Sequence, residues 1–361
     1  YNMGMPWGCF WAILSGLLCG IAIGMIIGYY ASGPDIRRIA AQSKIGPATV
    51  IISGLAAGMR SACLPILFIC AATFIGYQTA GIYGIALTAV GMLATVGATV
   101  TVYACGPIAN NSGGMSEMSG LDLKTRKITA DLGAAVHTTT AIGKGFATGS
   151  AALTAFALFA AFTQVAGLEV INIKKPLVAV GLLIGSLVPI ICSSLTITSA
   201  GKVASIIVEE VGRQFREIPG LLEGKEGAKP DPMKCVSISA TSAFGKIILP
   251  VLIAVLAPVA MGFLLGSEIL GGMIIGSTVM GLFLAFFMVN GGTAWDNVKK
   301  YIEEGHVGGK GSTNHKAAIV GDTVGVPFKD SSGPAMNIIM KLISVVSLVI
   351  APIIPVVGYI L

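Results

Sequence analysis

Apolar residues fall into long, nearly uninterrupted runs, and charged and small polar residues gather between them. A helix needs about 20 apolar residues to cross a bilayer core. About eight runs meet this need, at residues 6–30, 47–77, 81–105, 138–165, 176–199, 247–266, 269–290 and 336–360. The pattern predicts an all-α polytopic membrane protein with about eight transmembrane helices. We expect them to form a single transmembrane helical domain over residues 1–361.

Composition supports the same class. Hydrophobic residues make up 54% of the chain and charged residues only 11%, against about 25% charged residues in soluble domains. The 48 glycines suit closely packed helices in lipid. The seven cysteines are scattered, with neither metal-ligand spacing nor a disulfide framework. We therefore expect membrane lipid around the chain and no nucleic-acid partner.

Basic residues concentrate in alternate connections. Of the 23 basic residues, 18 lie in the loops 31–46, 106–137, 200–246 and 291–335. The intervening loops carry only Lys174 and Lys175. Because loops rich in lysine and arginine stay on the cytoplasmic side, these four loops are predicted to be cytoplasmic, with both termini on the opposite side.

The segment from Trp295 to Asp330 carries the most chemistry. If it is helical, two groups each share one face: Asp296 with Lys299 and Lys300, and Asp322 with Lys329 and Asp330. Carboxylates suit Mg²⁺, which prefers a few acidic ligands together with water and substrate phosphates. Lysines beside them suit phosphate oxygens. The alternative is a set of surface ion pairs.

Two lysines lie inside predicted spans, Lys144 and Lys341. An ionisable side chain within a span is a functional-site hypothesis by default, facing the interior of the bundle. Extension of the lysine toward the membrane surface is the alternative. The same two interpretations apply to Arg60.

Five segments, in this order, resemble the membrane-bound, ion-translocating inorganic pyrophosphatases. They are GPIANNSGGMSEMSGL from Gly106, TTTAIGKGFATGSAAL from Thr138, WDNVKKYIE from Trp295, KGSTNHKAAIVGDTVG from Lys310 and KDSSGPAMNIIMKLISVVSLVIAP from Lys329. The resemblance runs along essentially the whole chain and covers the C-terminal half of the family's sixteen-span fold.

The resemblance implies a pyrophosphate-energised pump that couples hydrolysis of Mg-pyrophosphate to translocation of H⁺ or Na⁺. It implies Mg²⁺ as cofactor, with K⁺ as a second candidate, and as partners a second copy of the chain and the N-terminal half of the same fold. It also implies residue roles: Asp322 and Lys144 catalytic, Asp296 and Asp322 metal-binding, Lys144, Lys299, Lys300 and Lys329 substrate-binding, and Lys341 at the ion gate.

Three positions depart from the family pattern. Asn110 replaces a metal-ligand aspartate, His137 replaces an asparagine, and Val326 replaces an aspartate that helps to hold the attacking water. Loss of a positioned acid–base group costs about 10²–10⁴ in rate. The alternative function is therefore a catalytically impaired or inactive pyrophosphatase paralogue that acts as a binding or scaffold membrane protein.

Overall fold

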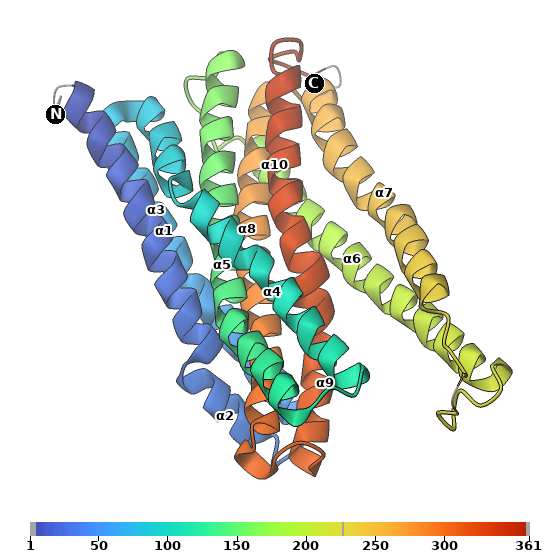
Figure 1. Cartoon of the computed structure of the whole chain (residues 1–361). Coiled ribbons are helices and arrows are strands. Elements are labelled where there is room, and N and C mark those ends of the chain that lie inside the picture. Colours follow the sequence, from blue (N-terminus) through green and yellow to red (C-terminus); the bar gives the residue numbers. More distant parts are fainter. Residues whose placement is uncertain (1–4, 226, 359–361) are drawn as a thin grey trace.

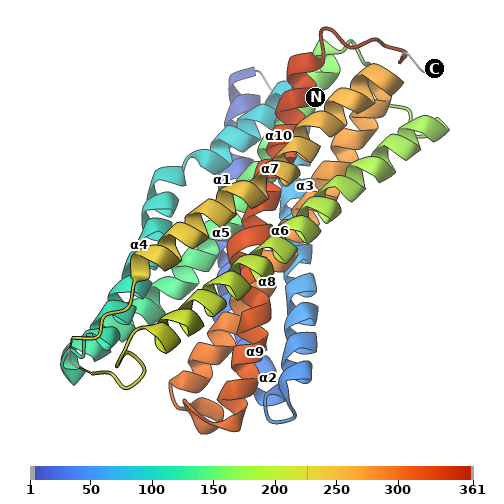
Figure 2. The same ribbon diagram turned by 90° about the vertical axis from the view of Figure 1, so that its right-hand side faces the viewer.

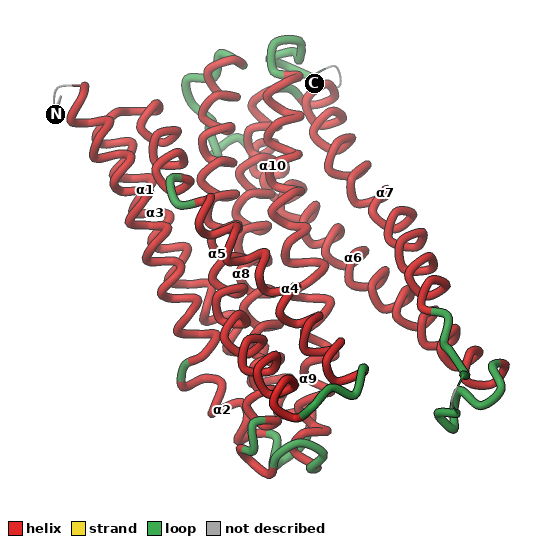
Figure 3. Tube along the Cα trace, in the orientation of Figure 1, coloured by secondary structure: helices red, strands yellow, loops and turns green. Residues whose placement is uncertain are grey.

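The computed structural model describes residues 5–225 and 227–358, with backbone alone for 5, 6, 110, 134, 135, 137 and 138. Within these ranges the chain is helical and contains no strand (Figures 1 and 3). The elements are α1 (Met5–Ser32), α2 (Pro34–Gln42), α3 (Pro47–Leu93), α4 (Val96–Met118), α5 (Leu123–Val165), α6 (Pro176–Glu217), α7 (Pro232–Leu265), α8 (Ser267–Glu303), η1 (His306–Gly308), α9 (Thr313–Pro327), η2 (Phe328–Ser332) and α10 (Gly333–Ile350).

Seven helical stretches of the described chain are long and apolar enough to cross a membrane: Trp7–Gln42, Pro47–Leu93, Thr139–Val165, Pro176–Glu217, Pro232–Leu265, Ser267–Glu303 and Thr313–Ile350. The prediction of an all-α polytopic membrane protein is confirmed at this level. The count is one lower than expected because residues 81–105 do not form one helix. The backbone leaves helical geometry at Ala80 and Gly81, and α3 ends at Leu93.

The charged segments predicted as loops are largely helical. Helices α4 and α5 extend through most of 106–137, and α8, α9 and η2 through most of 291–335. The physical reason is that charged residues continue a helix readily once it leaves the apolar region. Between α4 and α5, Asp122 accepts hydrogen bonds from the Thr125 amide at 3.0 Å and its hydroxyl at 2.6 Å. These bonds hold the pKa of Asp122 below its usual value.

Helices α6 and α7 form an antiparallel pair whose connected ends run out from the bundle (Figures 1 and 2). The tip of the pair is closed by the buried side chain of Gln214. Its amide nitrogen donates to the Asp231 carbonyl at 2.9 Å, and its amide oxygen accepts from the Asp231 N–H at 2.8 Å.

Helix α8 lies at the centre of the packing, with two thirds of its apolar span buried, 67%. Its most important anchor is Trp295, which is fully buried. A Cβ added at Gly54 would lie 2.1 Å from the indole nitrogen, and one at Gly321 would lie 2.9 Å from the ring. Because these two glycines have no side chains, α3 and α9 can approach the indole ring closely. This packing fixes the position of Asp296, the residue that follows Trp295.

Candidate functional site

Asp296 follows Trp295 in α8 and is surrounded by three lysines. Lys329 of η2 makes the closest contact with its carboxylate. The Lys300 ammonium lies 3.3 Å from Oδ2 and the Lys299 ammonium 3.7 Å from Oδ1. The Asp296 side chain is only 10% exposed, so these charges attract one another with little screening by water.

A second carboxylate, Asp322 of α9, is paired with Lys299. Its Oδ2 atom contacts the Lys299 ammonium, whereas its Oδ1 atom is buried and has no hydrogen-bond partner among the described residues. Lys299 therefore lies between the carboxylates of Asp296 and Asp322. The sequence placed these residues on two separate helical faces, and the structure brings the two faces together.

Lys329 lies in the segment that joins α9 to α10. Residues Phe328–Ser332 of this segment form a π-helical turn. The predicted face of Asp322, Lys329 and Asp330 is divided between partners on α8, because Lys329 binds Asp296 while Asp322 binds Lys299.

Lys144 of α5 points into the bundle and not toward the membrane surface. Its ammonium lies 2.6 Å from Oδ1 of Asp330 and donates to the backbone carbonyl of Lys329 at 3.2 Å. Its side chain is 11% exposed, whereas that of Asp330 is 50% exposed. Asp330 is a site residue to which the resemblance assigned no role, although the spacing pattern had included it.

The side chains of Lys144, Asp296, Lys329 and Asp330 border a polar cavity of about 140 Å³ between four helical segments. It is lined by Tyr103, Gly106 and Pro107 of α4, Thr140, Ala141 and Lys144 of α5, Thr293 and Asp296 of α8, and Lys329 and Asp330 of η2. A larger cavity of about 570 Å³ lies beside the α4–α5 connection and is bordered by Lys300, Glu303 and Lys310. Because Lys300 also binds Asp296, the two cavities adjoin.

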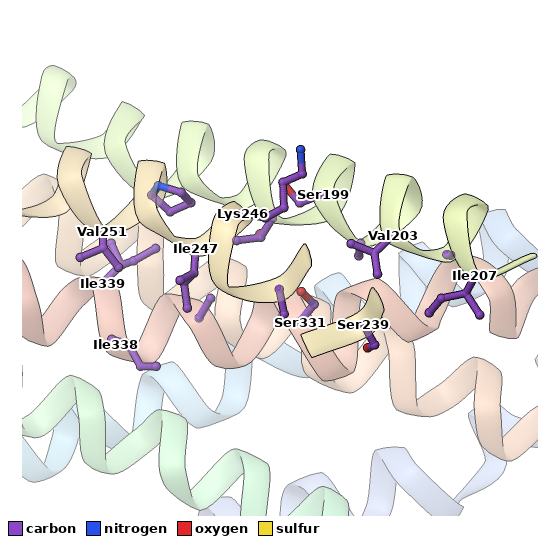
Figure 4. Close-up of a pocket in the computed structure, with 16 residues that line it drawn as sticks. Ser199, Val203, Ile207, Ser239, Lys246, Ile247, Val251, Ser331, Ile338 and Ile339 are labelled. Atoms are coloured by element: carbon purple, nitrogen blue, oxygen red, sulfur yellow. The ribbon is translucent and has the colours of Figure 1, made fainter. Parts of the chain in front are cut away.

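A further cavity of about 450 Å³ lies between α6, α7 and α10 and has mostly aliphatic walls (Figure 4). Lys246 is its one charged residue, with Ser199, Ser239 and Ser331 nearby. Among the described residues that line it there is no carboxylate, which is the ligand type that Mg²⁺ prefers.

Other sequence candidates lie apart from the cluster. Lys341 is in α10, partly buried, and makes no ion pair within the described part of the chain. Arg60 pairs with Asp35 at 3.2 Å. Val326 is 44% exposed in α9. The departures Asn110 and His137 lie in α4 and α5, and their side chains fall outside the described residues.

One buried histidine was not predicted as a site residue. His315, in the first turn of α9, accepts a hydrogen bond from the Gly311 amide at Nδ1 over 3.1 Å. Its Nε2 atom lies 2.9 Å from the Glu303 carboxylate. An accepting Nδ1 requires the proton on Nε2, so the ring donates to Glu303. This pair could not be predicted from spacing, because Glu303 and His315 lie on different helices, α8 and α9.

The donor set suits a divalent cation bound together with a phosphate. Two carboxylates contact the same Lys299 ammonium, and one of their oxygens, Asp322 Oδ1, is buried without a hydrogen-bond partner in the described chain. Mg²⁺ commonly takes one or two carboxylates and completes its shell with water and phosphate oxygens. Asp296 and Asp322 fit this requirement, and the surrounding lysines fit the phosphate.

Comparison with known proteins agrees with this chemistry. The sequence profile of the family described as "Inorganic H+ pyrophosphatase" matches residues 2–350. The chain is 52% identical over 355 residues to a putative K(+)-stimulated pyrophosphate-energized sodium pump of Clostridium tetani, covering 96% of this chain and 52% of that protein. It is 42% identical over 357 residues to a K(+)-insensitive pyrophosphate-energized proton pump of Methanosarcina mazei, covering 96% and 53%.

A K(+)-stimulated pyrophosphate-energized sodium pump of Thermotoga maritima is 43% identical over 359 residues, covering 95% of this chain and 49% of that protein. The chain thus spans about half the length of the curated relatives that it matches.

Proposed function

Because the chain belongs to the inorganic H+ pyrophosphatase family, we propose that it forms part of a pump that couples pyrophosphate hydrolysis to translocation of H⁺ or Na⁺. The observation that carries the proposal is the cluster in which Lys299, Lys300 and Lys329 surround Asp296, with Asp322 beside it. Buried carboxylates and lysines around a polar cavity are suited to a metal–polyphosphate complex.

In this proposal Asp296 and Asp322 hold Mg²⁺, and Lys299, Lys300 and Lys329 bind phosphate oxygens. Lys144 joins them from α5, since its ammonium borders the same cavity. The bound Mg²⁺ would neutralise charge on the phosphates. K⁺ remains a second candidate cofactor, because relatives described as K⁺-stimulated and as K⁺-insensitive both match the chain.

Asp330 is the side chain best placed to take a proton from attacking water. Its carboxylate borders the cavity, is half exposed and lies 2.6 Å from the Lys144 ammonium. Val326 has no group that could accept a proton. A role for Asp330 would allow hydrolysis to continue in a chain that carries valine at position 326.

The chain is proposed to correspond to the C-terminal half of the sixteen-span fold. Its match to about half of each relative supports this assignment. The N-terminal half of the fold would then complete the site and provide acidic partners for Lys341 at the ion gate. The connections 31–46, 106–137, 200–246 and 291–335 are proposed to be cytoplasmic, with both termini opposite.

The expected homodimer is also a proposal. The glycines at positions 16, 20, 24 and 28 form a stripe along α1, but this stripe packs against other helices of the same chain and does not supply the dimer interface. A Cβ at Gly16 would lie 1.9 Å from the Thr88 carbonyl oxygen of α3, and Gly24 and Gly28 face Ile142 of α5. An interface between copies would have to use another surface.

The test is Mg²⁺-dependent pyrophosphate hydrolysis and ion uptake by the intact protein in sealed vesicles. We expect both activities, and we expect Asp296→Asn to abolish them. Absence of hydrolysis in a folded protein that still binds Mg-imidodiphosphate would support the alternative, an inactive paralogue that only binds, which Asn110, His137 and Val326 favour. Absence of both binding and hydrolysis would overturn the proposal.

A further inference from the structure

The turn η2 contains a hydrogen bond that distinguishes it from the helices on either side. The N–H of Gly333 donates to the carbonyl of Phe328, five residues earlier. In an α-helix the same N–H would donate to Lys329, four residues earlier. Single π-helical turns of this kind are frequent at functional sites.

The displaced carbonyl, that of Lys329, has another donor. Pro334 follows Gly333 and has no N–H, so it cannot provide the next π-helical bond. The ammonium of Lys144 donates to this carbonyl instead, at 3.2 Å, and also binds Oδ1 of Asp330 at 2.6 Å. A side chain of α5 therefore replaces the backbone donor that α-helical geometry would require.

We propose that Lys144 is a positioning residue that keeps η2 in its π-helical register, and that an anion with several phosphate oxygens releases it. The identity of the anion as pyrophosphate rests on the proposed function. Its oxygens would compete for the Lys144 ammonium, and its negative charge would repel Asp330, which borders the same cavity. The freed Lys329 carbonyl then accepts the N–H of Gly333, and the turn becomes α-helical.

This change of partner has a consequence for α10. A shift of one residue in helical register corresponds to about 100° of rotation and about 1.5 Å of translation. Lys341 is part of α10 and turns with it. Occupation of the cavity would thus reorient Lys341 without contact between that lysine and the anion. Met336 and Met340 lie on the buried face of α10, and flexible methionines can repack as the helix turns.

The switch is tested by pulsed electron–electron distance measurements in the intact protein. Exposed Cys63, Cys70 and Cys105 are first replaced by alanine. Spin labels are then placed at Met25 and Val349, both well exposed, 72% and 69%. Magnesium imidodiphosphate, which is not hydrolysed, should shift the Met25–Val349 distance by several ångströms, on the order of 8 Å for a label on a rotating helix.

A matched control uses labels at Met25 and Ile319, since Ile319 precedes the turn in α9. This distance should not change. If both distances change together, or neither changes although the ligand binds, α10 does not turn against α9 and the proposal is overturned.

Two variants separate the register change from other movements. Deletion of Ser331 turns the Gly333–Phe328 bond into an α-helical one, so the variant should bind the ligand without any shift. A shift that persists in it contradicts the mechanism. Lys144→Met removes the side-chain donor, so the Met25–Val349 distance should be shifted before ligand is added. The measurement on Lys144→Met needs no ligand. If its Met25–Val349 distance is not shifted, the proposed switch is overturned while the proposed function stands. If imidodiphosphate does not bind the unmodified protein, the proposed function is contradicted instead.

Discussion

The indole nitrogen of Trp295 in α8 donates a hydrogen bond to the backbone carbonyl of Val50 in α3, over 3.0 Å. The bond joins two long helices directly beside the candidate site, since the residue after Trp295 is Asp296. The position of the site therefore depends on how closely α3 and α9 approach the Trp295 ring.

Substitution of alanine for Gly54 should destabilise the protein. The new Cβ would lie 2.1 Å from the indole nitrogen of Trp295, and overpacking of this kind costs about 1–3 kcal/mol. Gly97→Ala is the matched control, because a Cβ at that helical position meets nothing within 4 Å. Thermal unfolding of the purified protein should show a lower midpoint for Gly54→Ala alone. Equal midpoints would mean that the packing around Trp295 is not tight.

The carboxylate of Asp322 should determine the requirement for Mg²⁺. Its Oδ1 atom is buried and unpartnered within the described chain, and loss of a group that positions a metal typically weakens metal affinity about 10–100-fold. We expect Asp322→Asn to raise the half-saturating Mg²⁺ concentration of hydrolysis at least about tenfold. Glu223→Gln, in an exposed connection, should leave it unchanged. A normal Mg²⁺ titration of Asp322→Asn would exclude Asp322 as a ligand.

Lys144 and Lys341 should respond differently to replacement by methionine. Lys144 borders the cavity, binds Asp330 and holds η2, so its loss should reduce hydrolysis and ion uptake together. Lys341 lies apart from the cavity, and its loss should reduce ion uptake more than hydrolysis. Parallel assays on sealed vesicles measure the ratio of ions moved to pyrophosphate consumed. A normal ratio in Lys341→Met would remove that residue from the ion path.

An acid introduced at position 326 should change hydrolysis only slightly, because Asp330 is proposed to take the proton from the attacking water. Val326 is partly exposed on α9, four residues before Asp330, and a positioned acid–base group typically contributes about 10²–10⁴ in rate. We expect the turnover of Val326→Asp to stay close to that of Val326→Leu. A rise of about 10²-fold or more in Val326→Asp alone would contradict the role proposed for Asp330.

Much of this architecture could be predicted from hydrophobic patterning. The class of the protein follows from the length of its apolar runs, and the pairing of Asp296 with Lys299 and Lys300 follows from helical spacing. The two faces were identified separately because spacing within one helix says nothing about which other helix it contacts. The contact between Lys299 and Asp322 depends on the packing of α8 against α9 around Trp295.

Three local features of the backbone could not be predicted from the hydrophobic pattern. The turn η2 adds one residue to a helical turn, and neither glycine nor proline at its end specifies where the extra residue goes. A break inside an apolar run cannot be predicted from hydrophobicity either. Residues 81–105 have the composition of one span, yet α3 ends at Leu93. The burial of His315 could not be predicted, because it depends on the fold of the glycine-rich connection before α9.

Four ammonium groups and three carboxylates form one connected cluster beside the small cavity: Lys144, Lys299, Lys300 and Lys329 with Asp296, Asp322 and Asp330. Their formal charges leave one positive charge in excess. A bare divalent cation approaching this cluster is therefore opposed by the lysines, and a bare polyanion is opposed by the aspartates. A cation and an anion that arrive as one complex reduce both costs, so we expect the cluster to bind the preassembled pair ahead of either component.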